Sequence, residues 1–386
     1  MMNLLYFTAG IFCLTAGILN LTAVYIIYPL IVKSKNKKQK TENNEVSECA
    51  NIENKYSFCI IIPFYNEFGS ITKKLSSIHS EFISNTNSEI ILVNDGNAEF
   101  NIEQFKETNS IVISEKKIRI YKLSKNYGKL FAMYFAAKTT NADYLLFTDS
   151  NSIFKEDYFE NLLNSINSEN PDISGGLLQY RTQKQSALSE NVYWSAESKL
   201  KIAEQRADFF TLGLYGSNII IKRNLYLTHP CYIFCDFSLP LYYQTVKNKK
   251  IKLNEKLIVY EELPLNSFRE IFKIKKRIIH HALFGLHKLF TVSKMDARLI
   301  EQLYFHKISR WFTPYWLIMI ICGITLAAGL AGLKIVSAGI VVMLIAARLT
   351  GFNIKYLSAL NCAAFCAILS FCIKPALESW TPSKKD

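Results

Sequence analysis

An uncharged, apolar run near the start of the chain limits the possible folds more than any other feature of the sequence. Residues 4–32 contain no Asp, Glu, Lys or Arg, and a helix of that length crosses the hydrocarbon core of a bilayer, about 30 Å thick. Five lysines follow, at positions 33, 35, 37, 38 and 40. A signal peptide carries its charges before a shorter apolar stretch. The sequence therefore predicts an uncleaved membrane anchor over residues 1–33, with the lysines on the cytoplasmic side.

Two apolar stretches near the C-terminus predict a second membrane region, over residues 311–375. Residues 311–333 and 356–373 are uncharged, and each is long enough to span a bilayer. Residues 335–347 are also uncharged, but as a helix they reach only about 20 Å. They form either a thin span or a re-entrant segment, and the choice decides on which side the tail, residues 376–386, lies.

The composition of the whole chain narrows the class of protein. Half of the residues are hydrophobic and 20% are charged, which excludes a disordered or fibrous protein. The nine cysteines form no Cys-x-x-Cys pair, and an odd count fits reduced thiols better than a disulfide framework. The formal charge of +13 favours an acidic partner. Because the lysine clusters lie beside membrane segments, where the positive-inside rule accounts for them, we expect no nucleic acid.

After a polar linker over residues 34–55, the chain alternates short apolar runs with amphipathic stretches as far as residue 265. Four of these runs are strand-like: residues 58–62, 89–93, 118–123 and 143–148. The alternation predicts an α/β domain over residues 56–265, with a mainly parallel sheet and helices on both faces. Ligands of such sheets bind beyond the carboxyl ends of the strands.

Polar residues follow each predicted strand. The segments are Pro63-Phe-Tyr-Asn-Glu67, Asn94-Asp-Gly96, Ser124-Lys-Asn-Tyr-Gly-Lys129 and Asp149-Ser-Asn151. Each is an ordinary turn sequence by itself, but together they place several carboxylates and a lysine on one rim of the sheet. Carboxylates gathered in this way repel one another unless a cation or a hydrogen-bonding ligand lies among them. The pattern indicates a bound metal and a ribose or base.

These segments resemble successive motifs of the family 2 glycosyltransferases, whose catalytic domain has the GT-A fold. The likeness covers roughly residues 56–290 and continues in Tyr193-Trp194 with Glu197, Gly213-Leu-Tyr-Gly216 and Cys235-Asp-Phe237. Motifs in the family's order and spacing are more specific than any one of them. The resemblance implies a membrane-bound, inverting member related to polysaccharide synthases, in a bacterial cytoplasmic membrane. It would use a nucleotide-sugar donor, a UDP-sugar first of all, and a lipid-linked or cell-surface glycan acceptor.

The resemblance also assigns residues to the nucleoside half of the donor. It implies that Pro63, Tyr65 and Glu67 line the nucleoside pocket, and that Asp95 contacts the nucleoside. Lys129 would approach the base or the phosphates, although a solvated lysine at a helix end is an open alternative.

The same resemblance places a divalent cation, Mg²⁺ or Mn²⁺, on the diphosphate of the donor. Asp149 corresponds to the first carboxylate of the family's D-x-D motif, and Asn151 stands where many relatives have the second. An Asn oxygen is a neutral ligand that can still bind such a cation or its water. We therefore expect a metal site made by Asp149 and Asn151.

Asp236 corresponds to the family's catalytic base, which removes the proton of the acceptor hydroxyl as it attacks the sugar. Relatives commonly carry an acidic residue at the position of Cys235. The alternative for Asp236 is a cap for the helix that begins near Phe237. Should Asp236 not be the base, Glu204 and Glu197 are the next carboxylates to consider.

Residues 267–290 have a helical period with a basic face. The sequence therefore predicts basic amphipathic helices on the cytoplasmic leaflet over residues 266–310. In processive relatives this region carries Gln-x-x-Arg-Trp, which contacts donor and polymer. Here the matching segment, Ile274-Lys-Lys-Arg-Ile278, keeps only Arg277. That departure argues against a long-chain polysaccharide synthase, which stays an alternative together with a non-catalytic membrane protein of the same fold.

Overall fold

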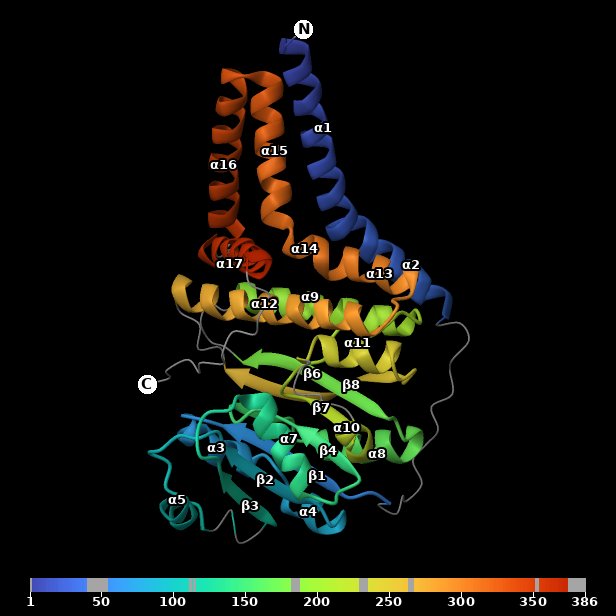
Figure 1. The fold of residues 1–386 in the computed structure, drawn as a ribbon, viewed down its shortest axis with the longest axis vertical. Coiled ribbons are helices and arrows are strands. Elements are labelled where there is room, and N and C mark those ends of the chain that lie inside the picture. The colour runs from blue at the N-terminus through green and yellow to red at the C-terminus, as the bar shows by residue number, and fades with distance from the viewer. Residues whose placement is uncertain are drawn as a thin grey trace.

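The structure is a computed structural model that describes residues 2–39, 55–110, 113, 116–181, 188–228, 235–262, 267–350 and 354–373. Its parts are stacked along the long axis in Figure 1. Upright helices at one end are followed by helices that lie crosswise to them, and the sheet domain forms the other end. The structure therefore has a region of long apolar helices and a globular sheet domain, as the apolar runs of the sequence predict.

The N-terminal segment is one long helix with a π-helical turn. It comprises α1 (Met2–Thr22), η1 (Ala23–Ile27) and α2 (Tyr28–Gln39). The stretch Leu4–Asn36 is long and apolar enough to cross a membrane, in agreement with the predicted anchor. The helix also extends to Gln39, so the first part of the predicted linker is helical; residues 40–54 lie outside the described residues.

Helix α15 (Thr313–Ala328) runs antiparallel to α1, and α16 (Leu330–Thr350) returns beside α15 (Figure 1). Glycines let α1 and α15 approach closely: a Cβ on Gly10 would lie 2.8 Å from the carbonyl oxygen of Gly323. Small residues commonly permit such contacts between membrane helices. The predicted segment 335–347 lies inside α16, which is a longer helix.

The crosswise layer contains the amphipathic helix α12 (Phe268–Val292), capped by Ser267, and α17 (Ile354–Ile373). Helix α17 is long and apolar enough to span a membrane, yet its side chains pack along α12, as in the cluster of Ile279 with Ala364 and Ala367. The same layer holds α13 (Ala297–Leu303), η4 (Tyr304–Ile308) and α14 (Ser309–Trp311). The stretch Ala297–Trp311 meets α15 at a bend of 68°.

The sheet has eight strands in the order β3-β2-β1-β4-β7-β6-β8-β5. Their bounds are β1 Phe58–Phe64, β2 Glu89–Asn94, β3 Ile118–Lys122, β4 Tyr144–Phe147, β5 Ser152–Phe154, β6 Ile173–Arg181, β7 Ile219–Lys222 and β8 Ile251–Glu262. Strands β1 to β4 are the four predicted ones, and they are parallel. Strand β7 is antiparallel to β4 and β6, while β6 and β8 are parallel. The sheet is therefore mixed.

Helices flank the sheet, as the sequence predicts. They are α3 (Phe68–Ser76), α4 (Ser80–Asn85), α5 (Ile102–Thr108), α7 (Lys129–Thr139), α8 (Tyr158–Glu169), α9 (Leu188–Arg206), α10 (Arg223–Leu227) and α11 (Ser238–Thr245). Every residue of β1 is buried, which explains why this strand is a continuous apolar run rather than an alternating one. Parallel β1 to β4 bring the ends of four strands to one edge, where the predicted site residues lie.

Candidate active site

Asp95, directly after β2, anchors the loop that follows β3. Its side chain is buried, and its two carboxylate oxygens accept hydrogen bonds from the backbone N–H groups of Tyr127, at 2.8 Å, and Gly128, at 2.9 Å. Gly128 has a φ of 92°, a conformation that favours glycine. Burial raises the pKa of Asp95, although the two N–H groups act to lower it. Asp95 thus shapes the rim of the sheet at the position predicted for the nucleoside.

The segment after β1 contacts the loop that carries the predicted metal ligands. Glu67 accepts a hydrogen bond from the Ser150 hydroxyl. The carbonyl group of Tyr65 accepts one from the side chain of Asn97, at 3.1 Å. Pro63 is buried within β1 beside Val93. Tyr65 and Glu67 therefore lie at the rim, whereas Pro63 belongs to the strand beneath it.

The ammonium group of Lys129 contacts Oδ1 of Asp149, across the gap between the loops after β3 and β4. Burial alone would lower the pKa of Lys129, but Asp149, with smaller contributions from Asp236 and Glu261, raises it. Lys129 is therefore not a solvated lysine at a helix end. It contacts one carboxylate, that of Asp149, and the charges of Asp236 and Glu261 also favour its protonated form.

A second lysine, Lys74, binds residues on both sides of the Asp149 turn. Lys74 is fully buried, and its Nζ donates to the hydroxyls of Thr148, at 2.7 Å, and Ser152, at 3.2 Å. The same Nζ lies 3.4 Å from the centroid of the Phe154 ring. Burial lowers the pKa of Lys74 well below its usual value, with Asp149 acting in the opposite direction. Sequence reasoning missed this residue.

The signal for Lys74 was nevertheless present in the sequence. Ile71, Leu75 and Ile78 make an apolar face at helical spacing, and Lys74 lies on that face. A charged residue within an apolar face is expected to have a specific polar partner, because an isolated buried charge is very costly.

The residues predicted to hold a divalent cation fit that role chemically. Asp149 and Asn151 are both partly exposed and belong to the turn between β4 and β5. In the part of the chain that the structure describes, no three His, Cys, Asp or Glu side chains could together hold a metal ion. Mg²⁺ usually takes only one or two carboxylates and completes its shell with substrate phosphates and water. One carboxylate and one amide oxygen match that pattern.

Asp236 lies in an exposed turn before α11, and a glycine-containing loop surrounds it. The carbonyl group of Asp236 accepts a hydrogen bond from the N–H of Leu214, at 2.9 Å. A Cβ on Gly216 would lie 3.3 Å from Oδ2 of Asp236. The N-cap of α11 is Phe237, and no side chain makes a capping hydrogen bond there. The alternative function of Asp236 as a helix cap is therefore not supported.

The crosswise helices lie directly against this turn. The ring of Trp311, in α14, contacts that of Phe237 with centroids 5.6 Å apart, and Gly285 of α12 packs on Ser238. Arg277, predicted to contact the donor, is a half-buried residue of α12. The turn of Asp236 is thus on the side of the sheet domain that faces the apolar helices.

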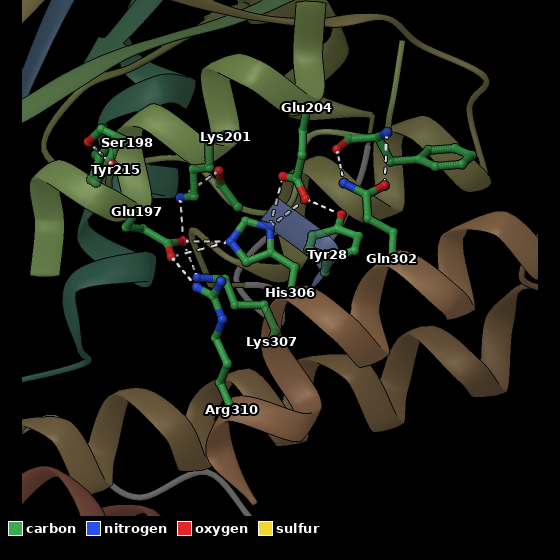
Figure 2. A network of polar contacts seen from close by, with 12 residues as sticks. Tyr28, Glu197, Ser198, Lys201, Glu204, Tyr215, Gln302, His306, Lys307 and Arg310 are labelled. Carbon is green, nitrogen blue, oxygen red and sulfur yellow. Dashed lines mark hydrogen bonds and ion pairs between the residues drawn. The ribbon is translucent and has the colours of Figure 1, made fainter. Parts of the chain in front are cut away.

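The two other candidates for the base are not accessible. Glu197 and Glu204, both in α9, are buried, and the imidazole of His306 lies between them. A carboxylate that accepts an acceptor proton must reach the substrate. Glu197 and Glu204 belong instead to an ion cluster, shown in Figure 2.

Known glycosyltransferases are similar to this chain in sequence. Residues 59–228 match the family described as Glycosyl transferase family 2. The chain is 29% identical over 123 residues to the minor teichoic acid biosynthesis protein GgaB of Bacillus subtilis. The aligned region covers 31% of this chain and 13% of that protein. The chain is 28% identical over 121 residues to an N-acetylglucosaminyltransferase of Bradyrhizobium elkanii, in an alignment that covers 31% of this chain and 64% of that protein. The chain thus spans less than two thirds of either relative.

A solved structure has the same fold over nearly the whole chain. It is the mannosyltransferase PcManGT from Pyrobaculum calidifontis in complex with GDP-Man and Mn²⁺, with a TM-score of 0.67 and 15% identity. The similarity covers 94% of this chain and 99% of that one, and at this identity it shows the fold alone. Together with the match over residues 59–228, it leads to one conclusion: residues 59–228 match a family 2 glycosyltransferase domain, and the chain has the GT-A-type fold.

Proposed function

We propose that this protein is a membrane-bound, inverting glycosyltransferase that moves one sugar, or a few, from a nucleotide-sugar donor to a lipid-linked or cell-surface glycan acceptor. The observation that carries the proposal is the position of Lys129. Its ammonium group contacts Asp149 and interacts electrostatically with Asp236. The residue predicted to hold a cation on the diphosphate thus contacts Lys129, and the residue predicted to act as base interacts electrostatically with the same lysine.

Asp236 has the features of a general base. Its carboxylate is exposed to solvent, and its turn is fixed by the hydrogen bond between its carbonyl group and Leu214. In the proposed reaction, the acceptor oxygen forms a bond to the anomeric carbon while the bond from that carbon to the diphosphate breaks. Asp236 takes the hydroxyl proton as the acceptor attacks, so that the single displacement inverts the anomeric centre.

Lys129 and the Asp149 loop would bind the leaving group. The diphosphate gains negative charge as its bond to the sugar breaks, and fixed positive groups stabilise that charge. Lys129 supplies one such group, and Lys74 holds the loop from below. A divalent cation on Asp149 and Asn151 would supply further charge stabilisation when bound. PcManGT was solved with Mn²⁺, which supports this assignment.

The position of the Asp236 turn supports an acceptor that arrives from the membrane. Helix α12 and Trp311 lie against the turn, and α1, α15 and α16 extend from the same side of the domain (Figure 1). A lipid-linked acceptor could thus present its head group to Asp236 while its chain stays in the bilayer. The teichoic acid biosynthesis protein among the relatives supports an acceptor in the cell envelope.

A donor panel tests the proposal directly. The full-length protein in detergent is incubated with UDP-N-acetylglucosamine, UDP-glucose or GDP-mannose and a bacterial membrane-lipid extract, and released nucleoside diphosphate is measured. We expect turnover of at least one donor, loss of activity in excess chelator, and its return with Mg²⁺ or Mn²⁺. Full turnover in excess chelator would contradict the proposed requirement for a divalent cation. No turnover of any donor would contradict the proposed glycosyltransferase activity.

A further inference from the structure

A buried cluster of charged side chains joins α9 to η4 and α14 (Figure 2). Helix α9 contributes Glu197, Lys201 and Glu204 at spacings of four and three residues, which puts them on one face. The carboxylate of Glu197 and the side chain of Lys201 are almost completely buried. We refer to these three residues, with Tyr28, His306, Lys307 and Arg310, as the α9 cluster.

His306 joins the two carboxylates. Its Nδ1 lies 2.7 Å from Oε1 of Glu204, and its Nε2 lies 3.2 Å from both oxygens of Glu197. Each ring nitrogen therefore lies within hydrogen-bond distance of a different carboxylate. His306 thus crosslinks two points of α9 to η4.

Glu197 is the carboxylate around which the basic side chains of the cluster gather. It also contacts Lys307 and lies 3.5 Å from Nη1 of Arg310 and 3.8 Å from Nζ of Lys201. Burial alone would raise the pKa of Glu197, but Lys307, His306 and Lys201 hold it well below the usual range. The carboxylate therefore stays ionised and keeps the surrounding cations in place.

Two segments outside the sheet domain complete the α9 cluster. Tyr28, in the anchor helix α2, donates a hydrogen bond to Glu204, and the ring of Tyr28 lies 6.4 Å from that of His306. His306 and Lys307 belong to the π-helix η4, between α13 and α14. Without either segment, buried charges of α9 would lose partners, which is strongly unfavourable.

Lys201 connects this cluster to the site. Its Nζ donates to the carbonyl oxygen of Gly213, at 3.1 Å, and lies 4.6 Å from the centroid of the Tyr215 ring. The next N–H along the chain, that of Leu214, binds the carbonyl oxygen of Asp236. Gly213 has a φ of 79°, so this loop has one specific conformation that Lys201 holds from one side and the Asp236 turn from the other.

We propose that Lys201 is a positioning residue for the Asp236 carboxylate, and that the α9 cluster holds Lys201 in place only when the anchor helix is docked. The inference rests on the proposed function. In this proposal, the position of Asp236 depends on the anchor helix through a series of contacts. They run in order through Tyr28, Glu204, His306, Glu197 and Lys201. Correct docking of the domain against the membrane segments and correct placement of the base then occur together.

The test compares Lys201→Met with Lys199→Met in the full-length protein, using the donors above that the wild type turns over. Met keeps the length of the side chain but removes the charge, and Lys199 is an exposed residue of the same helix. We expect Lys201→Met to lower kcat by about 10- to 100-fold and to leave the KM for the donor within about twofold. Lys199→Met should match the wild type in both.

The pH profile separates positioning from a merely structural role. Burial first, and then Lys307, lower the pKa of Lys201 to about 8, while Glu197, Asp236 and Glu204 act to raise it. His306, Arg310 and Tyr215 also face this region. Wild-type kcat should therefore fall as the pH rises through about 8, because Lys201 loses its charge. The Lys201→Met profile should lack that fall.

Tyr28→Phe provides a second test if Lys201→Met does not fold. It removes one hydroxyl and no charge, and it should lower kcat about 2- to 10-fold at constant donor KM. Wild-type kcat in Lys201→Met, or an unchanged fall near pH 8, would overturn the role of Lys201, and wild-type kcat in Tyr28→Phe would overturn the dependence on the anchor. If the wild type turns over no donor, the proposed function fails; if it does and the variants match it, only this inference fails.

Discussion

The ammonium group of Lys129 lies against the carboxylate of Asp149, the residue to which we assign a divalent cation. Two positive charges would therefore share one carboxylate in the working site. They compete for Asp149, since like charges repel, but both stabilise a diphosphate that binds between them. Removal of the Lys129 charge should therefore strengthen binding of the divalent cation and weaken binding of the diphosphate. These opposite changes distinguish the two effects.

We predict that Lys129→Met binds the cation more tightly and the donor more weakly. The Mg²⁺ or Mn²⁺ concentration for half-maximal activity should fall, while the KM for the nucleotide sugar should rise by about tenfold, equivalent to about 1.4 kcal/mol. Titrations of cation and of donor, each at saturating levels of the other, measure both quantities. Lys138→Met, on the exposed surface of the same helix, is the control. A Lys129→Met protein that needs more cation than the wild type would contradict the competition.

A second prediction concerns Asp236. Asp236→Asn should keep the turn and the donor affinity and lower the transfer rate by about 10²- to 10⁴-fold, because Asn cannot take the acceptor proton. The rate is measured as nucleoside diphosphate release, and donor affinity by equilibrium binding. Asp208→Asn makes the same chemical change at an exposed position with a φ of 56°, which Asn tolerates well. Parent-rate transfer by Asp236→Asn would remove Asp236 from the mechanism.

Most of the parallel half of the sheet could be predicted from the sequence because β1, β2 and β4 are buried on both faces. Strands β1 and β4 are buried along their whole length, so their apolar runs are unambiguous. Strand β8 alternates buried and partly exposed residues along much of Ile251–Glu262, with charged residues among them. Its paired residues are about 80 positions away in β6 and more than 100 positions away in β5. Pairing at that distance is a tertiary property, which a local pattern does not contain.

The position of the rim residues could be predicted because each of them follows a recognisable strand. The contacts between them could not. Strand order places Asp95, Lys129 and Asp149 at one edge, whereas the contact of Lys129 with Asp149 depends on the backbone at Gly128. The sequence misled us about Glu197 and Glu204, since charged residues on one helix face usually face solvent. Their partner His306 lies more than 100 residues further along the chain, and nothing local to α9 indicates it.

A third prediction concerns the orientation in the membrane. Lysines 33, 35, 37, 38 and 40 follow the apolar helix, so the segment from Lys33 to about Arg310 should be cytoplasmic. Ser84, at the exposed end of α4, is suitable for Ser84→Cys labelling. An impermeant maleimide should label this variant more than the parent only after the cells are permeabilised. Extra labelling in intact cells would reverse the orientation and place the domain away from cytoplasmic nucleotide sugars.

The last prediction concerns the stability of the α9 cluster. Glu197→Gln leaves Lys307 and His306 without their shared carboxylate in a buried place. Breaking a buried pair in this way typically costs about 3–5 kcal/mol, which corresponds to a fall in apparent Tm on the order of 5–10 °C. Thermal unfolding of the full-length protein in detergent, followed by tryptophan fluorescence, measures it. Glu103→Gln breaks only an exposed pair with Lys106 and should change Tm by about 2 °C at most.

The pH dependence of that difference follows from the sign of the pKa shift of Glu197. Its folded-state pKa is held below the usual value by Lys307 and His306, against the effect of burial. The stabilisation is therefore complete above the unfolded pKa, about 4.3, and is lost as the pH falls through the folded value. The Tm difference between Glu197→Gln and the wild type should be largest near neutral pH and should shrink below about pH 4. A difference that persists unchanged in acid would mean that Glu197 contributes through packing rather than through its charge.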